Sequence, residues 1–187
     1  MNQKGIAPLI IVGIVVVVAV AVGIGIYVAT RGGGGLGPGN GIASATSLSF
    51  NADFTLPTSP TADGSVGALS MFALGTNKLK DIGSVNMKIR CEGTVQGQTV
   101  IFIVNGEQRK AWVYRDGQWL DLSENYSWDE IWDVSCGENG LITGYQIALS
   151  GWTGGEYTYT DPTGTSIRFY DIELNPTLDD SLFVPSG

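Results

Sequence analysis

The feature that most restricts this chain is an uncharged run of 25 residues, 6–30, made mostly of valine, isoleucine, alanine and glycine. A helix rises about 1.5 Å per residue, so this run is long enough to cross the roughly 30 Å hydrocarbon core of a bilayer. We therefore predict a transmembrane helix at 6–30, with the lipid bilayer as its partner. The alternative is a cleaved secretory signal, because Ala29 and the glycines after it resemble a small-residue cleavage site.

Charges on either side of the run set the expected orientation. The α-amino group and Lys4 precede it and Arg31 follows it, a small excess of positive charge that places residues 1–5 in the cytoplasm. The remaining chain then lies outside the cytoplasm, so we expect a single-pass protein of the cell membrane. Asn125 begins an Asn-Tyr-Ser sequon, a candidate N-glycosylation site that fits this location.

The chain beyond the apolar run divides into a spacer and one domain. Residues 31–41 read RGGGGLGPGNG, and a glycine-dominated stretch of this kind behaves as a flexible linker. Residues 42–187 have an ordinary composition, with enough apolar and aromatic side chains for one core. We expect a single extracytoplasmic β domain there.

Alternation with a period of two predicts the class of that domain. Leu48, Phe50, Ala52, Phe54 and Leu56 alternate with polar residues, which is the pattern of a half-buried antiparallel strand. Similar segments predict further strands near 67–74, 84–91, 99–104, 110–114, 141–149, 156–160 and 166–174. The expected fold is mainly β (α+β): the transmembrane helix, then an antiparallel sheet with one short helix.

Turn and cap signals complete this outline. Asn105-Gly106 and Asp116-Gly117 are pairs that favour tight type I′ hairpin turns. Ser127 and Glu130 form a Ser-x-x-Glu capping box, which predicts the start of the short helix, and Gly137 is expected to end it.

Composition argues against several functions. The net charge of −8 would repel a polyanion, so we expect no nucleic-acid partner. The chain has no histidine, and therefore lacks the commonest general base and transition-metal ligand. Acids such as Asp129 and Asp180 are explained by a helix cap and a turn, so we expect no enzyme, no catalytic residue, no metal and no cofactor.

The two cysteines, Cys91 and Cys136, are spaced unlike any zinc motif. In an oxidising space outside the cytoplasm, a disulfide between them is the favoured interpretation. Two free buried thiols are the alternative.

The segment Lys4-Gly5-Ile6-Ala7-Pro8-Leu9-Ile10 resembles the start of archaeal and bacterial type IV pilin-like proteins. In that family a peptidase cuts after the glycine and leaves an apolar assembly helix, so the resemblance implies a processing site at Gly5. The family usually has an acidic residue five positions after the cut, where this chain has Ile10. An uncleaved signal anchor, with Pro8 in its first turn, is the alternative.

Two segments of the domain resemble another family. Residues 112–119, WVYRDGQW, and 172–185, IELNPTLDDSLFVP, resemble the LolA-type outer-membrane lipoprotein carriers and the related LppX-type half-barrel proteins, and the similarity extends over roughly 48–185. These families end in a strand, an Asn-x-x-Leu/Ile-x-Asp-x-x-Phe turn and a terminal apolar clip. The resemblance implies a strongly curved antiparallel half-barrel whose apolar concave face, closed by helical lids, holds acyl chains.

A groove of that kind would be lined by apolar side chains from several strands and from the short helix. The candidates are Phe50, Phe54, Met71, Phe72, Met87, Ile101, Ile103, Trp112, Tyr114 and Trp132, each of which core packing would also explain. The expected function is a membrane-tethered extracytoplasmic module that binds lipid or lipoprotein acyl chains. The alternative is a type IV pilin-like structural surface subunit processed after Gly5.

Overall fold

The structure is a computed structural model and describes residues 41–55, 75–95, 98–138, 140–160 and 166–186. The apolar run at 6–30, nearly all of the linker and the strand predicted near 67–74 lie outside the described residues.

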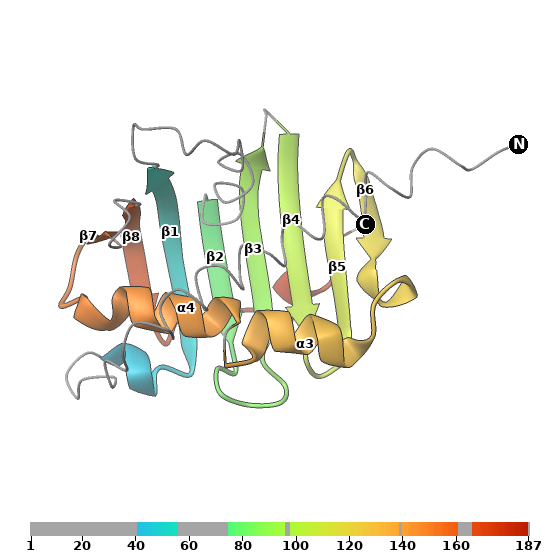
Figure 1. Ribbon diagram of the computed structural model, residues 1–187, viewed down its shortest axis with the longest axis horizontal. Coiled ribbons are helices and arrows are strands. Elements are labelled where there is room, and N and C mark those ends of the chain that lie inside the picture. The colour runs from blue at the N-terminus through green and yellow to red at the C-terminus, as the bar shows by residue number, and fades with distance from the viewer. Residues whose placement is uncertain (1–40, 56–74, 96–97, 139, 161–165, 187) are drawn as a thin grey trace, which may run out of the picture.

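Eight strands form one antiparallel sheet in the order β6-β5-β4-β3-β2-β1-β8-β7 (Figure 1). Their bounds are β1 Ser47–Thr55, β2 Gly75–Lys80, β3 Lys88–Val95, β4 Gln98–Asn105, β5 Lys110–Arg115, β6 Gln118–Asp121, β7 Tyr157–Thr160 and β8 Ser166–Leu174. Strands β1 to β6 follow the chain as a meander. The last strand, β8, then returns to pair with β1, which brings the two ends of the domain together.

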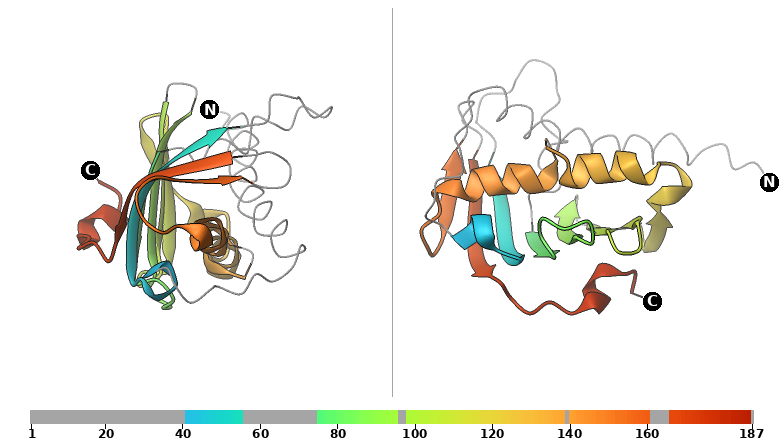
Figure 2. Two further views of the ribbon diagram at one scale, coloured as in Figure 1. Left: turned by 90° about the vertical axis from the view of Figure 1, so that its left-hand side faces the viewer. Right: turned by 90° about the horizontal axis from the view of Figure 1, so that it is seen from below.

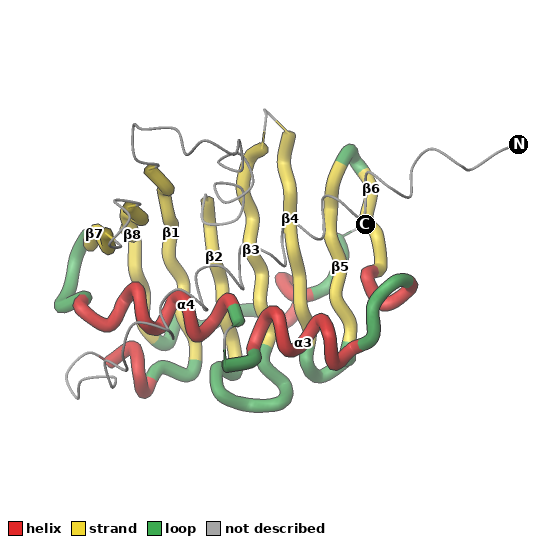
Figure 3. The backbone as a smooth tube through the Cα atoms, in the orientation of Figure 1, coloured by secondary structure: helices red, strands yellow, loops and turns green. Residues whose placement is uncertain are grey.

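Two short α-helices, α3 Trp128–Cys136 and α4 Leu141–Ala148, lie almost end to end across one side of the sheet, which we call the helix face (Figures 1 and 2). Residues 175–186, the C-terminal segment, cross the opposite side, which we call the C-terminal face (Figure 2). Short 3-10 helices complete the fold: η1 Gly41–Ser44, η2 Leu122–Glu124, η3 Leu149–Gly151 and η4 Asp180–Phe183 (Figure 3).

The main core lies between the helices and the sheet. Phe50 of β1, which is 1 % exposed, packs edge-on against Tyr145 of α4 and Phe169 of β8, with ring centroids 4.9 and 5.5 Å away. Aliphatic residues of the central strands, such as Leu79 and Ile89, fill the rest of this layer. In β1, the alternating apolar positions Leu48, Phe50 and Ala52 thus point to the helix face, and the polar positions between them point to the C-terminal face.

The structure corrects the predicted fold class, which was wrong. The described residues form a single eight-stranded antiparallel sheet with two α-helices rather than a half-barrel with one. Residues 141–149, predicted as a strand, form α4 and η3, and Leu141, Tyr145 and Ala148 follow the spacing of one helix side. Among the described helices, none combines the length and the apolar character needed to cross a membrane. The helix predicted at 6–30 lies outside the described residues and stays a prediction.

Local signals for the turns and the helix start had mixed outcomes. The capping box is confirmed: the Ser127 side chain accepts from the Glu130 amide, and the Glu130 carboxylate accepts from the Ser127 amide. Asp116 and Gly117 both have positive φ and join β5 to β6 tightly, as predicted. The prediction of a tight two-residue turn at Asn105-Gly106 was wrong, because the longer loop 106–109 joins β4 to β5.

Candidate functional site

A straight row of side chains crosses six strands on the C-terminal face. Each residue lies directly opposite the next in the register of neighbouring strands, and opposed residues share a face of the sheet. Strands lie about 4.8 Å apart, so the row spans roughly 24 Å. From β1 to β6 this cross-strand row consists of Asn51, Thr76, Glu92, Ile101, Tyr114 and Trp119.

The β1–β3 end of the row is polar and hydrogen-bonded. The Thr76 hydroxyl donates to Asn51 Oδ1 over 2.8 Å, and Asn51 Nδ2 donates to Asp171 Oδ2 over 2.9 Å. Next to these residues the surface sinks into an open depression of about 440 Å³. The depression is lined by Gly75, Thr76, Glu92, Gly93, Thr94 and Thr99, and so by hydroxyl, carboxylate and backbone groups.

Arg90 holds the carboxylate of the row in place. Its Nη2 donates to Glu92 Oε2 over 2.8 Å, and its Nη1 donates to the carbonyl oxygen of Leu182 in the C-terminal segment over 3.1 Å. The Arg90 side chain is 15 % exposed and that of Glu92 is 44 % exposed. The partly buried guanidinium therefore neutralises the charge of Glu92 while leaving the carboxylate open to solvent.

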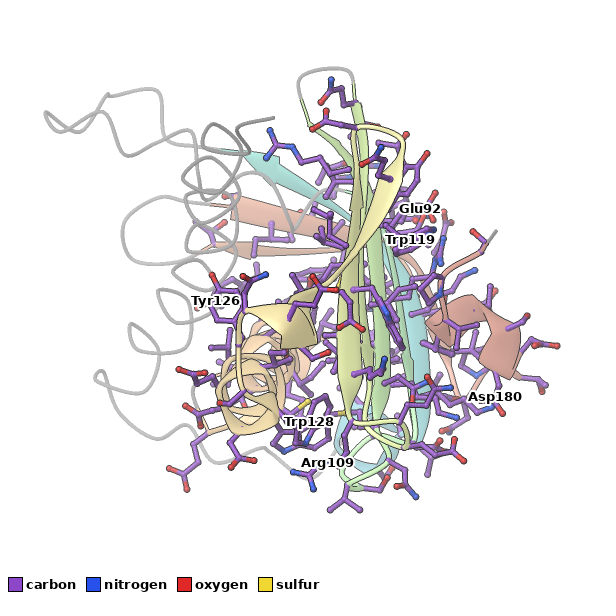
Figure 4. All side chains as sticks on the ribbon, turned by 90° about the vertical axis from the view of Figure 1, so that its right-hand side faces the viewer. Glu92, Arg109, Trp119, Tyr126, Trp128 and Asp180 are labelled. Atoms are coloured by element: carbon purple, nitrogen blue, oxygen red, sulfur yellow. The ribbon has the colours of Figure 1, made fainter. Side chains whose placement is uncertain are left out.

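The β5–β6 end of the row is aromatic. The rings of Tyr114 and Trp119 lie 5.3 Å apart at 56°, and both side chains are half-buried. Trp119 Nε1 donates to the carbonyl oxygen of Ser186 over 3.0 Å, which fixes the indole relative to the C-terminal segment. Figure 4 shows Glu92 and Trp119 on the side of the sheet away from the helices, above Asp180 of the C-terminal segment.

The C-terminal segment forms the lower wall of this site. Phe183, which is 0 % exposed, packs with Ile101, Ile103 and Trp112, and Asn105 Nδ2 donates to its carbonyl oxygen over 3.1 Å. At the other end of η4, the Asp180 carboxylate accepts from the ammonium groups of two lysines, Lys80 and Lys88, each over 2.8 Å.

Lys80 and Lys88 keep the Asp180 carboxylate ionised down to low pH, so only strong acid should weaken its contacts with the sheet. Hydrogen bonds from Lys80 and Lys88 lower the pKa of Asp180 from 3.8 to about 2. A carboxyl whose pKa is lower in the folded state adds stability above its unfolded pKa, and that stability is lost as the pH falls through the folded value. The stability that the Asp180 contacts add should therefore be complete at neutral pH and be lost as the pH falls below 3.8 and through about 2.

The helix face contains a buried polar cluster rather than an open site. The Tyr145 hydroxyl donates to Asn77 Oδ1 over 2.9 Å, and a hydrogen bond links it to the Cys91 thiol. Asn77, Cys91 and Tyr145 are 1 %, 4 % and 5 % exposed. Burial raises the pKa of Cys91 to about 12. Burial also raises the pKa of Cys136 to about 12.

The structure does not bring the predicted groove residues together. Phe50, Met87 and Trp132 belong to the core between the helices and the sheet. The candidates on the other side of the sheet, under or beside the C-terminal segment, are Ile101, Ile103, Trp112 and Tyr114. Met71, Phe72 and the side chain of Phe54 lie outside the described part of the chain.

The predicted disulfide, glycosylation site and processing site lie away from the cross-strand row or outside the described residues. Cys91 and Cys136 are free thiols in the structure, which therefore shows the alternative and not the favoured disulfide. Asn125 is exposed just after η2, and Ser127 of its sequon also caps α3. Gly5 lies outside the described residues.

Sequence reasoning missed the polar members of the cross-strand row, Asn51, Thr76 and Glu92, and the aromatic Trp119. The alternation carried a signal for two of them, because Asn51 and Glu92 lie between the apolar positions of β1 and β3. Thr76 and Trp119 lie in β2 and β6, which the alternation did not predict. Only the register between strands, which the sequence does not give, places them in one line.

The two thiols lead to a direct prediction. Since thiolates are the reactive species and burial opposes their formation, iodoacetamide at neutral pH should alkylate neither Cys91 nor Cys136 in the native protein at an appreciable rate. After unfolding in guanidinium without a reductant, mass spectrometry should find both alkylated. If alkylation requires a reductant as well, the cysteines form a disulfide and the structure is wrong there.

No family model, no curated protein and no solved structure matches this chain.

Proposed function

We propose that this chain is a binding protein held at the outer surface of a membrane, and that it binds its ligand on the C-terminal face. The observation that carries this proposal is the contrast between the two faces of the sheet. On the helix face, side chains such as Phe50 and Phe169 are buried. On the C-terminal face, polar and aromatic groups of the cross-strand row stay partly exposed around a depression, which is a usual composition for a ligand site.

In this proposal the apolar run at 6–30 attaches the protein to the membrane, and the glycine-rich linker gives the domain freedom to present its C-terminal face. An acyl chain is not the ligand we favour. Of the apolar residues expected to hold it, those with described side chains are divided between two cores on opposite sides of the sheet, where they pack against the protein itself. The pilin-like alternative depends on Gly5 and stays a prediction.

Hydroxyl-radical footprinting of the full chain in lipid nanodiscs tests this proposal. Three probes would be compared: a mixture of neutral oligosaccharides, the polyanion heparin, and free fatty acid. We expect one probe to slow the oxidation of Tyr114 and Trp119, whereas the oxidation of Trp152, which packs against the helix-face core, stays unchanged. Protection of Trp128 and Trp132 of α3 instead, or no protection by any probe, would contradict binding on the C-terminal face.

A further inference from the structure

We infer that the cross-strand row binds a linear, uncharged saccharide chain that lies across the strands. This inference rests on the proposed function and adds the chemical class and direction of the ligand. It combines three observations: the straight course of the row, the different chemistry of its two ends, and the local neutrality of its one carboxylate.

The course of the row favours an extended ligand. Successive residues are paired directly from β1 to β6, so their side chains follow a line perpendicular to the strands. The depression occupies the β2–β4 part of this line, and the aromatic pair is at its β6 end. Between them Ile101 is buried with Phe183, so a ligand that reaches both features passes beside it, over the exposed Thr99 of the same strand. A compact ligand would contact only one of these two features, whereas a chain of roughly 24 Å would contact both.

The two ends match the two kinds of surface on a sugar ring. A pyranose has an apolar face of C–H groups and a rim of hydroxyl groups. The rings of Tyr114 and Trp119 offer half-buried aromatic surface with little conformational entropy to lose. In the depression, the hydroxyls of Thr94 and Thr99 can donate and accept hydrogen bonds, and that of Thr76, which donates to Asn51, can accept one, as the hydroxyls of a sugar require.

Charge argues for a neutral chain. Glu92 is paired with Arg90, so the row has no unpaired cation to attract an anionic polymer, and the net charge of −8 would repel one. An aliphatic chain would leave the polar groups of the depression without partners on burial, which is unfavourable. An extended peptide normally adds to a free strand edge, whereas strands β2 to β5 are paired on both sides.

The experiment titrates the full chain in nanodiscs with cello-oligosaccharides, chito-oligosaccharides and isomalto-oligosaccharides of increasing length, followed by calorimetry. We expect affinity in at least one series to rise with chain length until the row is filled. Trp119→Ala should weaken binding about tenfold or more, and Thr76→Val should weaken it about three- to tenfold. Trp152→Phe, the matched control on the other side of the sheet, should leave affinity unchanged.

Thr76→Val keeps the size and shape of a surface side chain, so it tests the site even if Trp119→Ala disturbs the fold. Affinity that does not depend on oligosaccharide length would overturn the inference of a linear ligand. An equal loss of affinity in the Trp152→Phe control would overturn the location of the site. If none of the sugars binds while heparin or fatty acid protects Trp119 in footprinting, the saccharide inference fails and the proposed function survives. If no probe protects the row, both fail.

Discussion

Replacing Phe183 by alanine is expected to lower the free energy of unfolding by about 3–5 kcal/mol. Phe183 is 0 % exposed and is the buried residue through which the C-terminal segment enters the small core of Ile101, Ile103 and Trp112. Removal of its ring leaves a cavity between the segment and the sheet, and the polar contacts of the segment cannot close it. Urea denaturation followed by tryptophan fluorescence would measure the loss.

Leu182→Ala is the matched control for this prediction. Leu182 precedes Phe183 in the same 3-10 helix but is only half-buried, so its truncation should cost clearly less, about 1 kcal/mol. Equal effects of the two substitutions, or a loss below about 1 kcal/mol for Phe183→Ala, would show that the segment does not pack as the structure has it. Phe183→Ala should also weaken ligand binding, because the segment holds Arg90 and Trp119.

The sequence predicted the strands well where alternation was regular and the turn chemistry was local. The predicted limits of β8 agree with the structure, and those of β4, β5 and β7 agree to within a residue. The helix start at Ser127 was confirmed because a capping box depends only on residues three apart. These signals involve neighbours in the chain, and no tertiary contact overrides them.

The wrong predictions concern residues whose structure depends on contacts with residues far away in the sequence. Asn105-Gly106 resembles a hairpin turn, but Asn105 is buried and donates to the Phe183 carbonyl oxygen, 78 residues away. Gly106 meanwhile lies against the backbone of the β2–β3 loop, where an added Cβ would be 2.4 Å from the Val85 oxygen. Strand β2 was missed because its sequence, GTNKLK, has few apolar residues. This segment is a strand because it pairs with β1 on one side and β3 on the other.

The candidate site could not be predicted for a related reason. Alternation identifies two faces for each strand, and the prediction assigned ten apolar residues to one groove, whereas the structure divides those with described side chains between both faces. Ile101, Ile103 and Trp112 in fact occupy the positions that alternate with the helix-face residues Phe102 and Val113. Both faces of the sheet are covered at its centre, one by helices and the other by the C-terminal segment, so an apolar residue on either face is core.

Tyr145→Phe is expected to lower the free energy of unfolding by about 1–3 kcal/mol, although it removes a single oxygen atom. The ring should stay packed against Phe50, so the loss comes from the Asn77 amide oxygen, which would be buried without its donor.

Chemical denaturation of the two single variants, Tyr145→Phe and Asn77→Leu, and of the double variant would separate this effect from packing. The second substitution removes the amide that Tyr145→Phe leaves without a donor. The double variant should therefore lose less unfolding free energy than the sum of the two single losses. Additive losses would mean that the hydroxyl and the amide act independently. Because this hydrogen bond joins α4 to β2, coupling would show that a buried polar contact fixes the position of α4 on the apolar face of the sheet, where packing alone is non-directional.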